Sequence, residues 1–218
     1  MSSDQLLDSL VKASGETLYM TFVAALFIVL LGLPLGVLLV ATDKGGIWEK
    51  PVLNRILGGL VNIFRSAPFI ILMVAVVPLT RLIVGTTIGT TAAVVPLVVA
   101  AVPFFGRVVE QSLREVDPGL VEAAVAMGST NWQIIAKVLV PEALASLIRG
   151  TALMLINVMG YSAMAGAVGG GGLGDLAVKY GYFRYDTKVL VWCVVVLLVL
   201  VQAIQFLGDR LAARFANK

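Results

Sequence analysis

The segment Glu122-Ala-Ala-Val-Ala-Met-Gly128, closed by Val138-Leu-Val-Pro141, interrupts a chain that is otherwise built from long apolar runs. Those runs predict membrane helices, and they carry no catalytic chemistry. A membrane protein of this kind needs one place at which it receives energy from outside the bilayer. This segment is the best candidate for that place.

The residues around this segment predict a helix, a glycine turn and a second helix. Asp117 can cap the first helix, and Pro118 suits its first position. Gly128 can adopt the left-handed conformation that ends a helix. Thr130 and Gln133 have the spacing of a capping box, which predicts a second helix running toward Pro141.

The first of these helices should carry a mixed surface. Leu120, Ala124 and Met127 are spaced to share one helical face, and Glu122 adds a charge. A short rigid element of this kind is suited to dock in a groove of another protein. Physical chemistry alone equally allows an amphipathic helix that lies in the membrane interface.

The composition indicates a polytopic membrane protein. Of the 218 residues, 59% are hydrophobic and 13% are charged, whereas soluble domains carry about 25% charged residues. The charge-free run from Thr17 to Thr42 would form a helix of about 39 Å, which exceeds the hydrocarbon core of about 30 Å.

We expect an all-α fold with one membrane domain over residues 1–218. Five spans are expected at about 17–42, 56–80, 83–106, 146–168 and 189–208, with the loop that contains Glu122 at about 115–140 between spans three and four. The second span should begin within 52–64.

The distribution of basic residues predicts an orientation. If the Glu122 segment is cytoplasmic, most of the 16 Lys and Arg residues lie inside, and five spans place the N-terminus outside and the C-terminus inside. The expected inside residues are Lys44, Lys50, Arg55, Arg65, Arg107, Arg114, Lys137, Arg149, Arg210, Arg214 and Lys218. The expected outside residues are Lys12, Arg81, Lys179, Arg184 and Lys188.

Several classes of function find no support. The chain has no histidine, and we expect no metal site, no bound cofactor and no nucleic-acid partner. Cys193 stands alone in the last span and suits packing better than chemistry. Gly169, Gly171 and Gly174 match a dinucleotide-binding pattern, but no strand precedes them, so a glycine-rich turn is the better interpretation.

The fourth span is the least lipid-like. Polar atoms at bilayer depth usually face other helices or a water-filled route, and flexible methionines can seal a pathway yet yield to a solute. We therefore expect this helix to line a pathway, although gap-filling in the core would explain any single methionine. The candidate pathway or gate residues are Asn157, Met159, Tyr161, Ser162 and Met164.

Small residues four apart predict close helix packing, because apposed glycines let backbones approach in lipid. Packing within one subunit is the simpler interpretation, and a moving interface is the alternative. Three such pairs occur in the apolar runs: Gly32/Gly36, Gly85/Gly89 and Gly166/Gly170.

The pattern Glu122-Ala123-Ala124-x3-Gly128-x9-Val138-x-Val140-Pro141 resembles the cytoplasmic motif of ABC importer permeases, with valine at two positions where the motif has Ile and Leu. Further stretches resemble one branch of that family, the permeases of D-/L-methionine importers. These stretches are Asn62-Ile-Phe-Arg-Ser-Ala-Pro-Phe-Ile-Ile-Leu72, Gly160-Tyr-Ser-Ala-Met-Ala-Gly-Ala-Val-Gly-Gly-Gly-Gly-Leu-Gly174 and Gln205-Phe-Leu-Gly-Asp-Arg210.

The resemblance covers about residues 15–214 and implies a type I importer fold in a bacterial inner membrane. Two copies would form an alternating-access pathway for an amino acid, with methionine favoured. Two cytoplasmic ATPase subunits would hydrolyse ATP, so this chain would not be an enzyme, and a periplasmic or lipid-anchored binding protein would deliver the solute. Glu122 would engage or orient the ATPase contact, Ala123 and Ala124 would allow close approach, and Gly128 would permit the turn. Met127 and Pro141 complete this coupling site.

Other functions remain as alternatives. A permease for a different amino acid or small solute would share the same architecture. An ion-driven secondary transporter would need ionisable residues at depth, and none is evident because Glu110 and Asp209 lie near span ends. An intramembrane enzyme built on Ser162 would lack a histidine and a neighbouring lysine.

Overall fold

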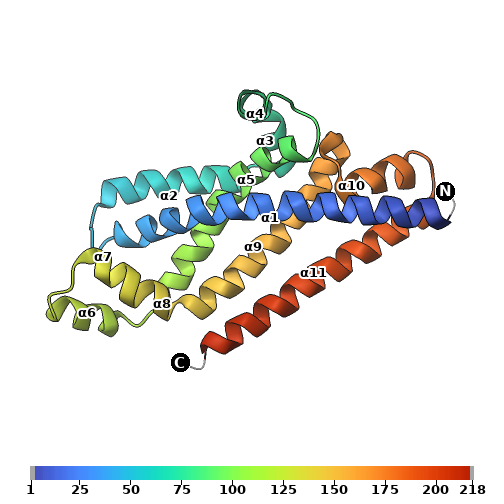
Figure 1. The fold of residues 1–218 in the computed structure, drawn as a ribbon. Coiled ribbons are helices and arrows are strands. Elements are labelled where there is room, and N and C mark those ends of the chain that lie inside the picture. Colours follow the sequence, from blue (N-terminus) through green and yellow to red (C-terminus); the bar gives the residue numbers. More distant parts are fainter. Residues whose placement is uncertain (1–2, 217–218) are drawn as a thin grey trace. The chain divides into compact units, whose positions relative to one another are not determined.

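The computed structural model describes residues 3–216, and every regular element in that range is helical (Figure 1). This confirms the all-α fold class. Lys218, which is among the basic residues expected inside, lies outside the described residues.

The helices are α1 (Ser3–Ala41), α2 (Pro51–Ser66), α3 (Phe69–Ala75), α4 (Val77–Val84), α5 (Thr90–Arg114), α6 (Pro118–Ala126), α7 (Asn131–Ile134), α8 (Val140–Glu142), α9 (Leu144–Ala165), α10 (Gly172–Leu176) and α11 (Thr187–Ala216). Three π-helical turns join some of them: η1 (Ile135–Leu139), η2 (Gly166–Gly170) and η3 (Ala177–Tyr182).

Four helical segments are long and apolar enough to cross a membrane. They cover Asp4–Ala41, Thr90–Arg114, Leu144–Gly170 and Thr187–Phe215, and a fifth span is reached when the bent pair α2 and α3 is counted as one. The five-span fold class is thus compatible with the structure. The first helix begins well before residue 17. The polar turns that come before the apolar run are part of the same helix, which starts at Ser3.

The second span is not the single helix expected over about 56–80. Helix α2 ends at Ser66 and α3 begins at Phe69, and the break between them contains Ala67 and Pro68. Proline lacks a backbone N–H and disfavours helical geometry in the residue before it, so the sequence Ala67-Pro68 stops α2. A second break follows at Val76, and Gly85 ends α4 in the left-handed conformation with φ of 80°.

The described chain divides into two compact units whose boundaries fall inside α1, α5, α9 and α11 and at the break between α2 and α3. The first unit comprises residues 3–27, 67–101 and 154–206. Its buried apolar residues include Leu10 and Ala13 of α1, Leu173 of α10 and Cys193 of α11. Cys193 has no exposed surface and is free, which agrees with a packing role.

The second unit comprises residues 28–66, 102–153 and 207–216. In it α1 and α5 approach closely at glycines. A Cβ added to Gly36 would lie 2.6 Å from the Gly106 carbonyl oxygen and 2.5 Å from the Val109 Cβ, and one added to Gly32 would lie 2.9 Å from the Phe105 ring. The Gly32/Gly36 pair therefore packs within one subunit, as the simpler interpretation expects.

The Gly85/Gly89 pair does not pack, which corrects that expectation. Both residues have positive φ, and an added Cβ would meet nothing within 4 Å at either position. Their role is to turn the chain between α4 and α5. The Gly166/Gly170 pair does pack, because an added Cβ at Gly166 would meet the backbone of Gly174 and Asp175.

Candidate functional site

The helix–turn–helix around Glu122 has the local structure that its residues predict. Asp117 caps α6, and its Oδ1 accepts a hydrogen bond of 2.8 Å from the Gly119 N–H. Gly128 ends the helix with φ of 77°. The capping box is formed as well: the Thr130 N–H donates to Gln133 Oε1 at 2.8 Å, and the Gln133 N–H donates to Thr130 Oγ1 at 3.4 Å.

The second helix reaches Pro141 through a π-helical turn. η1 follows α7 directly, and Pro141 lies in the first turn of α8. Proline cannot donate the backbone hydrogen bond that an α-helix would require at that position. A π-helical turn just ahead of it lets the helical path continue with the hydrogen bonds that remain.

Helix α6 presents an exposed apolar surface. Met127 is 79% exposed, Val125 is 57% exposed and Leu120 is 42% exposed, with Trp132 of α7 at 68%. Ala124 is buried instead, so it does not share an accessible face with Leu120 and Met127 as the spacing suggested. Helix α6 packs on η1, and Ala124 lines one hollow together with Lys137 and Val138 of η1. The remaining candidate coupling residues Glu122, Ala123, Gly128 and Pro141 are exposed.

Hollows of a few hundred Å³ flank α6. One of about 350 Å³ is lined by Glu122 together with Asp43, Lys44 and Arg114, and one of about 420 Å³ is lined by Glu122, Gly45 and other residues. Glu122 therefore lies beside the connection between α1 and α2. A third hollow of about 460 Å³, lined in part by Met127, Gly128 and Lys137, occupies the other side.

The connection between α1 and α2 is fastened to α7. The Asn131 side-chain amide donates a hydrogen bond of 2.9 Å to the Ile47 carbonyl oxygen. The rings of Trp48 and Trp132 meet edge to face with centroids 5.3 Å apart, a geometry that stabilises aromatic pairs. The segment around Glu122 is thus tied to the end of α1 and the start of α2.

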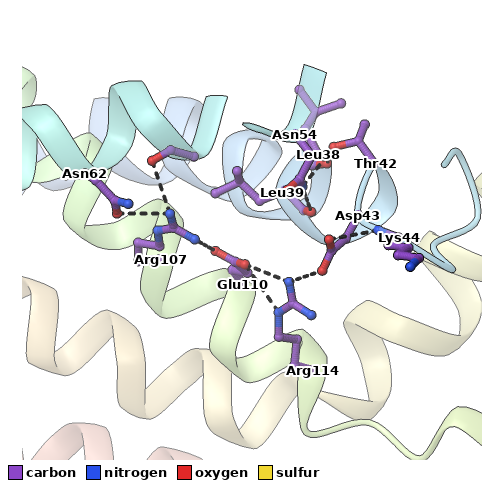
Figure 2. A network of polar contacts seen from close by, with 11 residues as sticks. Leu38, Leu39, Thr42, Asp43, Lys44, Asn54, Asn62, Arg107, Glu110 and Arg114 are labelled. Carbon is purple, nitrogen blue, oxygen red and sulfur yellow. Dashed lines mark hydrogen bonds and ion pairs between the residues drawn. The ribbon is translucent and has the colours of Figure 1, made fainter. Parts of the chain in front are cut away.

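A buried carboxylate on α5 organises a polar network that the sequence interpretation missed (Figure 2). Glu110 is 6% exposed, and its two oxygens accept hydrogen bonds from two arginines of the same helix. Arg107 donates to Oε2 at 2.6 Å, and Arg114 donates to Oε1 at 3.0 Å. The spacing of these three residues over two helical turns is the signal that would have revealed the cluster.

The two arginines carry the network to neighbouring segments. Arg107 donates to Asn62 Oδ1 at 3.0 Å and to the Gly58 carbonyl oxygen at 3.2 Å, both on α2. Arg114 donates to Asp43 Oδ2 at 2.5 Å, just beyond the end of α1. Figure 2 shows these links as one continuous chain of contacts. We call Asp43, Asn62, Arg107, Glu110 and Arg114 the Glu110 network.

Asp43 is the member of this network outside the candidate spans. The hydrogen bond from Arg114, together with one of 2.8 Å from the Lys44 backbone N–H, holds the pKa of the Asp43 carboxyl below its ordinary value. The carboxylate is therefore charged at neutral pH and able to pair with Arg114.

The candidate pathway residues of α9 do not share one environment. Met159 and Ser162 are buried, and the Ser162 hydroxyl donates to the Met159 carbonyl oxygen at 2.8 Å. Asn157, Tyr161 and Met164 follow helical spacing and are all at least partly accessible. These three form one candidate face for a pathway, and the other two pack inside the chain.

Asn157 and Tyr161 have distinctive surroundings. The Asn157 Oδ1 atom is buried and has no hydrogen-bond partner among the described residues. The Tyr161 ring stacks on Phe69 of α3, with centroids 4.5 Å apart and an interplanar angle of 3°. Buried polar atoms normally find a partner, so this face of α9 is suited to meet a further polar group.

The glycine-rich segment forms a tight turn, as expected. Gly169, Gly171 and Gly172 all have positive φ. The Gly172 N–H donates to the Glu16 carboxylate at 2.8 Å, and the Leu173 N–H donates to Thr17 Oγ1 at 2.9 Å. These bonds from α1 satisfy the first N–H groups of α10 and fix the turn in place.

Residues 32–218 match a known protein family. That family is described as "Binding-protein-dependent transport system inner membrane component". This match covers most of the chain and includes the whole helix–turn–helix around Glu122. The chain belongs to this family. It is therefore an integral membrane permease component of a transport system.

Relatives within this permease family share about half of their residues with the chain. The probable D-methionine transport system permease protein MetI of Vibrio cholerae is 54% identical over 211 residues, which is 97% of this chain and 94% of that protein. The D-methionine transport system permease protein MetI of Escherichia coli K12 is 51% identical over 164 residues, covering 75% of this chain and 76% of that protein.

Two solved structures share the fold of the chain. An inward-facing structure of the MetNI methionine ABC transporter contains a chain with a TM-score of 0.96 and 50% identity, and 99% of each chain is covered. A chain from an amino acid ABC transporter crystallised with histidines gives a TM-score of 0.79 at 18% identity, with 98% of this chain and 97% of that chain covered. The second likeness shows the shared fold alone.

Proposed function

We propose that this chain is the permease subunit of an ATP-driven importer for methionine. The observation that carries the proposal is the identity of 54% over 97% of the chain with a D-methionine transport permease. The likeness to a chain of the MetNI transporter supports it independently of that alignment. Two copies of the chain form the pathway, two ATPase subunits bind on the cytoplasmic side of the bacterial inner membrane, and a periplasmic or lipid-anchored protein delivers the solute.

The ATPase contact is made by α6 and the turn after it. Exposed Met127 and Val125 supply the apolar surface, Glu122 supplies a charge, and Gly128 supplies the turn. Buried interfaces draw their binding energy from such apolar anchors and a few charged contacts. ATP-driven closure of the ATPases moves this segment and shifts the permease between inward-open and outward-open states.

The solute pathway uses the accessible face of α9. Tyr161 and Met164 contribute a mostly apolar surface, and the partly accessible Asn157 lies beside them, with its Oδ1 atom buried and without a partner among the described residues. This face carries no fixed charge for a zwitterion. Selectivity therefore rests mainly on the binding protein, and the permease acts as a gate.

Uptake by proteoliposomes tests the proposal. The chain is purified with its ATPase, reconstituted, and given the methionine-loaded binding protein and ATP. We expect ATP-dependent accumulation of radiolabelled methionine that excess unlabelled methionine abolishes and other amino acids do not. Stronger competition by a different amino acid would favour a permease of another specificity, and a chain that purifies without an ATPase would overturn the importer assignment.

A further inference from the structure

The Glu110 network joins three segments of the second unit through one buried carboxylate. Its contacts run from Asp43, after α1, through Arg114 and Glu110 of α5 to Arg107 and then to Asn62 of α2. Each link is a charge-assisted hydrogen bond of 2.5 to 3.0 Å. Bonds of this kind are shorter and stronger than those between neutral groups.

Burial of Glu110 makes the network behave as a unit. Its side chain is 8% exposed, whereas those of Arg107 and Arg114 are 23% and 47% exposed. A buried carboxylate that loses one of its cationic partners keeps its desolvation cost without compensation. The two carboxylates and two guanidinium groups balance in charge, so displacement of one member favours movement of the others with it.

The network lies directly beside the proposed ATPase-coupling segment. Arg114 is the last residue of α5, and α6 begins at Pro118. Arg114, Asp43 and Glu122 line the same hollow of about 350 Å³. The connection between α1 and α2 is therefore held from two sides, by the Asp43–Arg114 pair and by the contacts of Ile47 and Trp48 with α7.

We propose that the Glu110 network is a positioning device that transmits movement of the α6–α7 segment to α1 and α2. This inference rests on the proposed importer function. Its members contact neither solute nor ATP, and they act by keeping three segments in register with α6. ATP hydrolysis then produces solute movement only while the network is intact.

The test compares variants of the reconstituted complex in methionine transported per ATP hydrolysed. Asp43→Asn removes the charge at the partly exposed end of the network, and Asn62→Leu removes the acceptor on α2. Glu110→Gln removes the central charge. The matched control is Glu115→Gln, which changes an exposed carboxylate next to Arg114 in the sequence but outside the network. Asp43→Glu serves as the conservative rescue.

We expect the transported-to-hydrolysed ratio to fall about tenfold in the three network variants, the size of effect found for residues that couple distant sites. ATPase co-purification should stay normal, and Glu115→Gln and Asp43→Glu should keep the wild-type ratio. Asp43→Asn combined with Asn62→Leu should lower the ratio less than the product of the single effects, because both act on one unit.

Three results would overturn the inference. An unchanged ratio in Asp43→Asn and Asn62→Leu would show that the network does not position the segments. A smaller amount of complex with a normal ratio in the complex that remains would assign it a structural role only. The same loss of ratio in Glu115→Gln would show that the effect is not specific to the network. Failure of the wild-type complex to transport methionine would instead reject the proposed function.

Discussion

Glu122 and Ala124 illustrate how two neighbouring residues of one motif face different surroundings. Glu122 is exposed beside the hollows that flank α6, whereas Ala124 is 2% exposed and packs within the chain. The small side chain of Ala124 lets α6 lie close to η1. The charge of Glu122 remains available to a partner protein.

We expect Glu122→Ala to uncouple ATP hydrolysis from transport while membrane insertion stays normal. Loss of an interfacial charge contact worth roughly 1.4 kcal/mol or more would lower transport about tenfold or more. Uptake by the reconstituted complex measures this effect, and Glu142→Ala, which removes an exposed carboxylate of α8, is the control. Wild-type uptake by Glu122→Ala would contradict the coupling role.

The Asp43–Arg114 pair should make the stability of the folded chain depend on pH in the acidic range. The pKa of Asp43 is lowered in the folded chain, so its stabilising effect is complete at neutral pH and is lost as the pH falls below about 3.8. The effect should stay under about 1 kcal/mol, because the pair is partly solvent-exposed.

Thermal unfolding in detergent can check this dependence. The wild-type protein should melt above Asp43→Asn at pH 7, and the difference between the two melting temperatures should shrink progressively as the pH falls below about 3.8. A difference that does not change with pH over this range would show that the carboxylate charge is not its source.

At the scale of elements, the contact between α1 and α5 depends on the absence of a side chain at Gly36. We expect Gly36→Ala to destabilise the protein by about 1–3 kcal/mol, because the added methyl group would overlap backbone and side-chain atoms of α5. Gly15→Ala is a control in the same helix, since an added Cβ there meets nothing within 4 Å. That control should be neutral or stabilising by up to about 1 kcal/mol.

The elements that local sequence controls could be predicted, and those that depend on distant residues could not. Asp117, Gly128 and the Thr130–Gln133 box act within a few residues of themselves, and the structure confirms all of them. Pro68 is a helix-bending residue, but the expectation of one span over about 56–80 did not place a break there. Gly85 and Gly89 have packing-like spacing, and only the structure shows that they turn the chain.

The Glu110 network escaped prediction for the same reason. The positions of Arg107, Glu110 and Arg114 show that they can pair along one helix. Nothing local indicates that α2 and the end of α1 supply Asn62 and Asp43 to complete the chain of contacts. Those partners lie 45 and 71 positions away in the sequence.

At the scale of the whole molecule, the single cysteine offers a direct test of orientation. Cys193 is the only cysteine in the chain and is buried, so Cys193→Ala gives a background without thiols. In this background we expect a membrane-impermeant maleimide to label Lys12→Cys from the outer side and to leave Lys137→Cys unlabelled until the membrane is opened. Both positions are exposed in the folded chain. Labelling in the opposite order would reverse the proposed topology.

The π-helical turn before Pro141 has a consequence for how this fold tolerates change over evolution. A π-helical turn accommodates one residue more than an α-helical turn of the same hydrogen-bonded path. η1 therefore accommodates one extra residue in the helical path between the capping box of α7 and the long helix α9. Deletion of one residue between Ile135 and Leu139 should convert the turn to an ordinary α-helical one and leave the register of the helix beyond it unchanged. Lineages of this permease should therefore tolerate a difference of one residue in the length of this stretch.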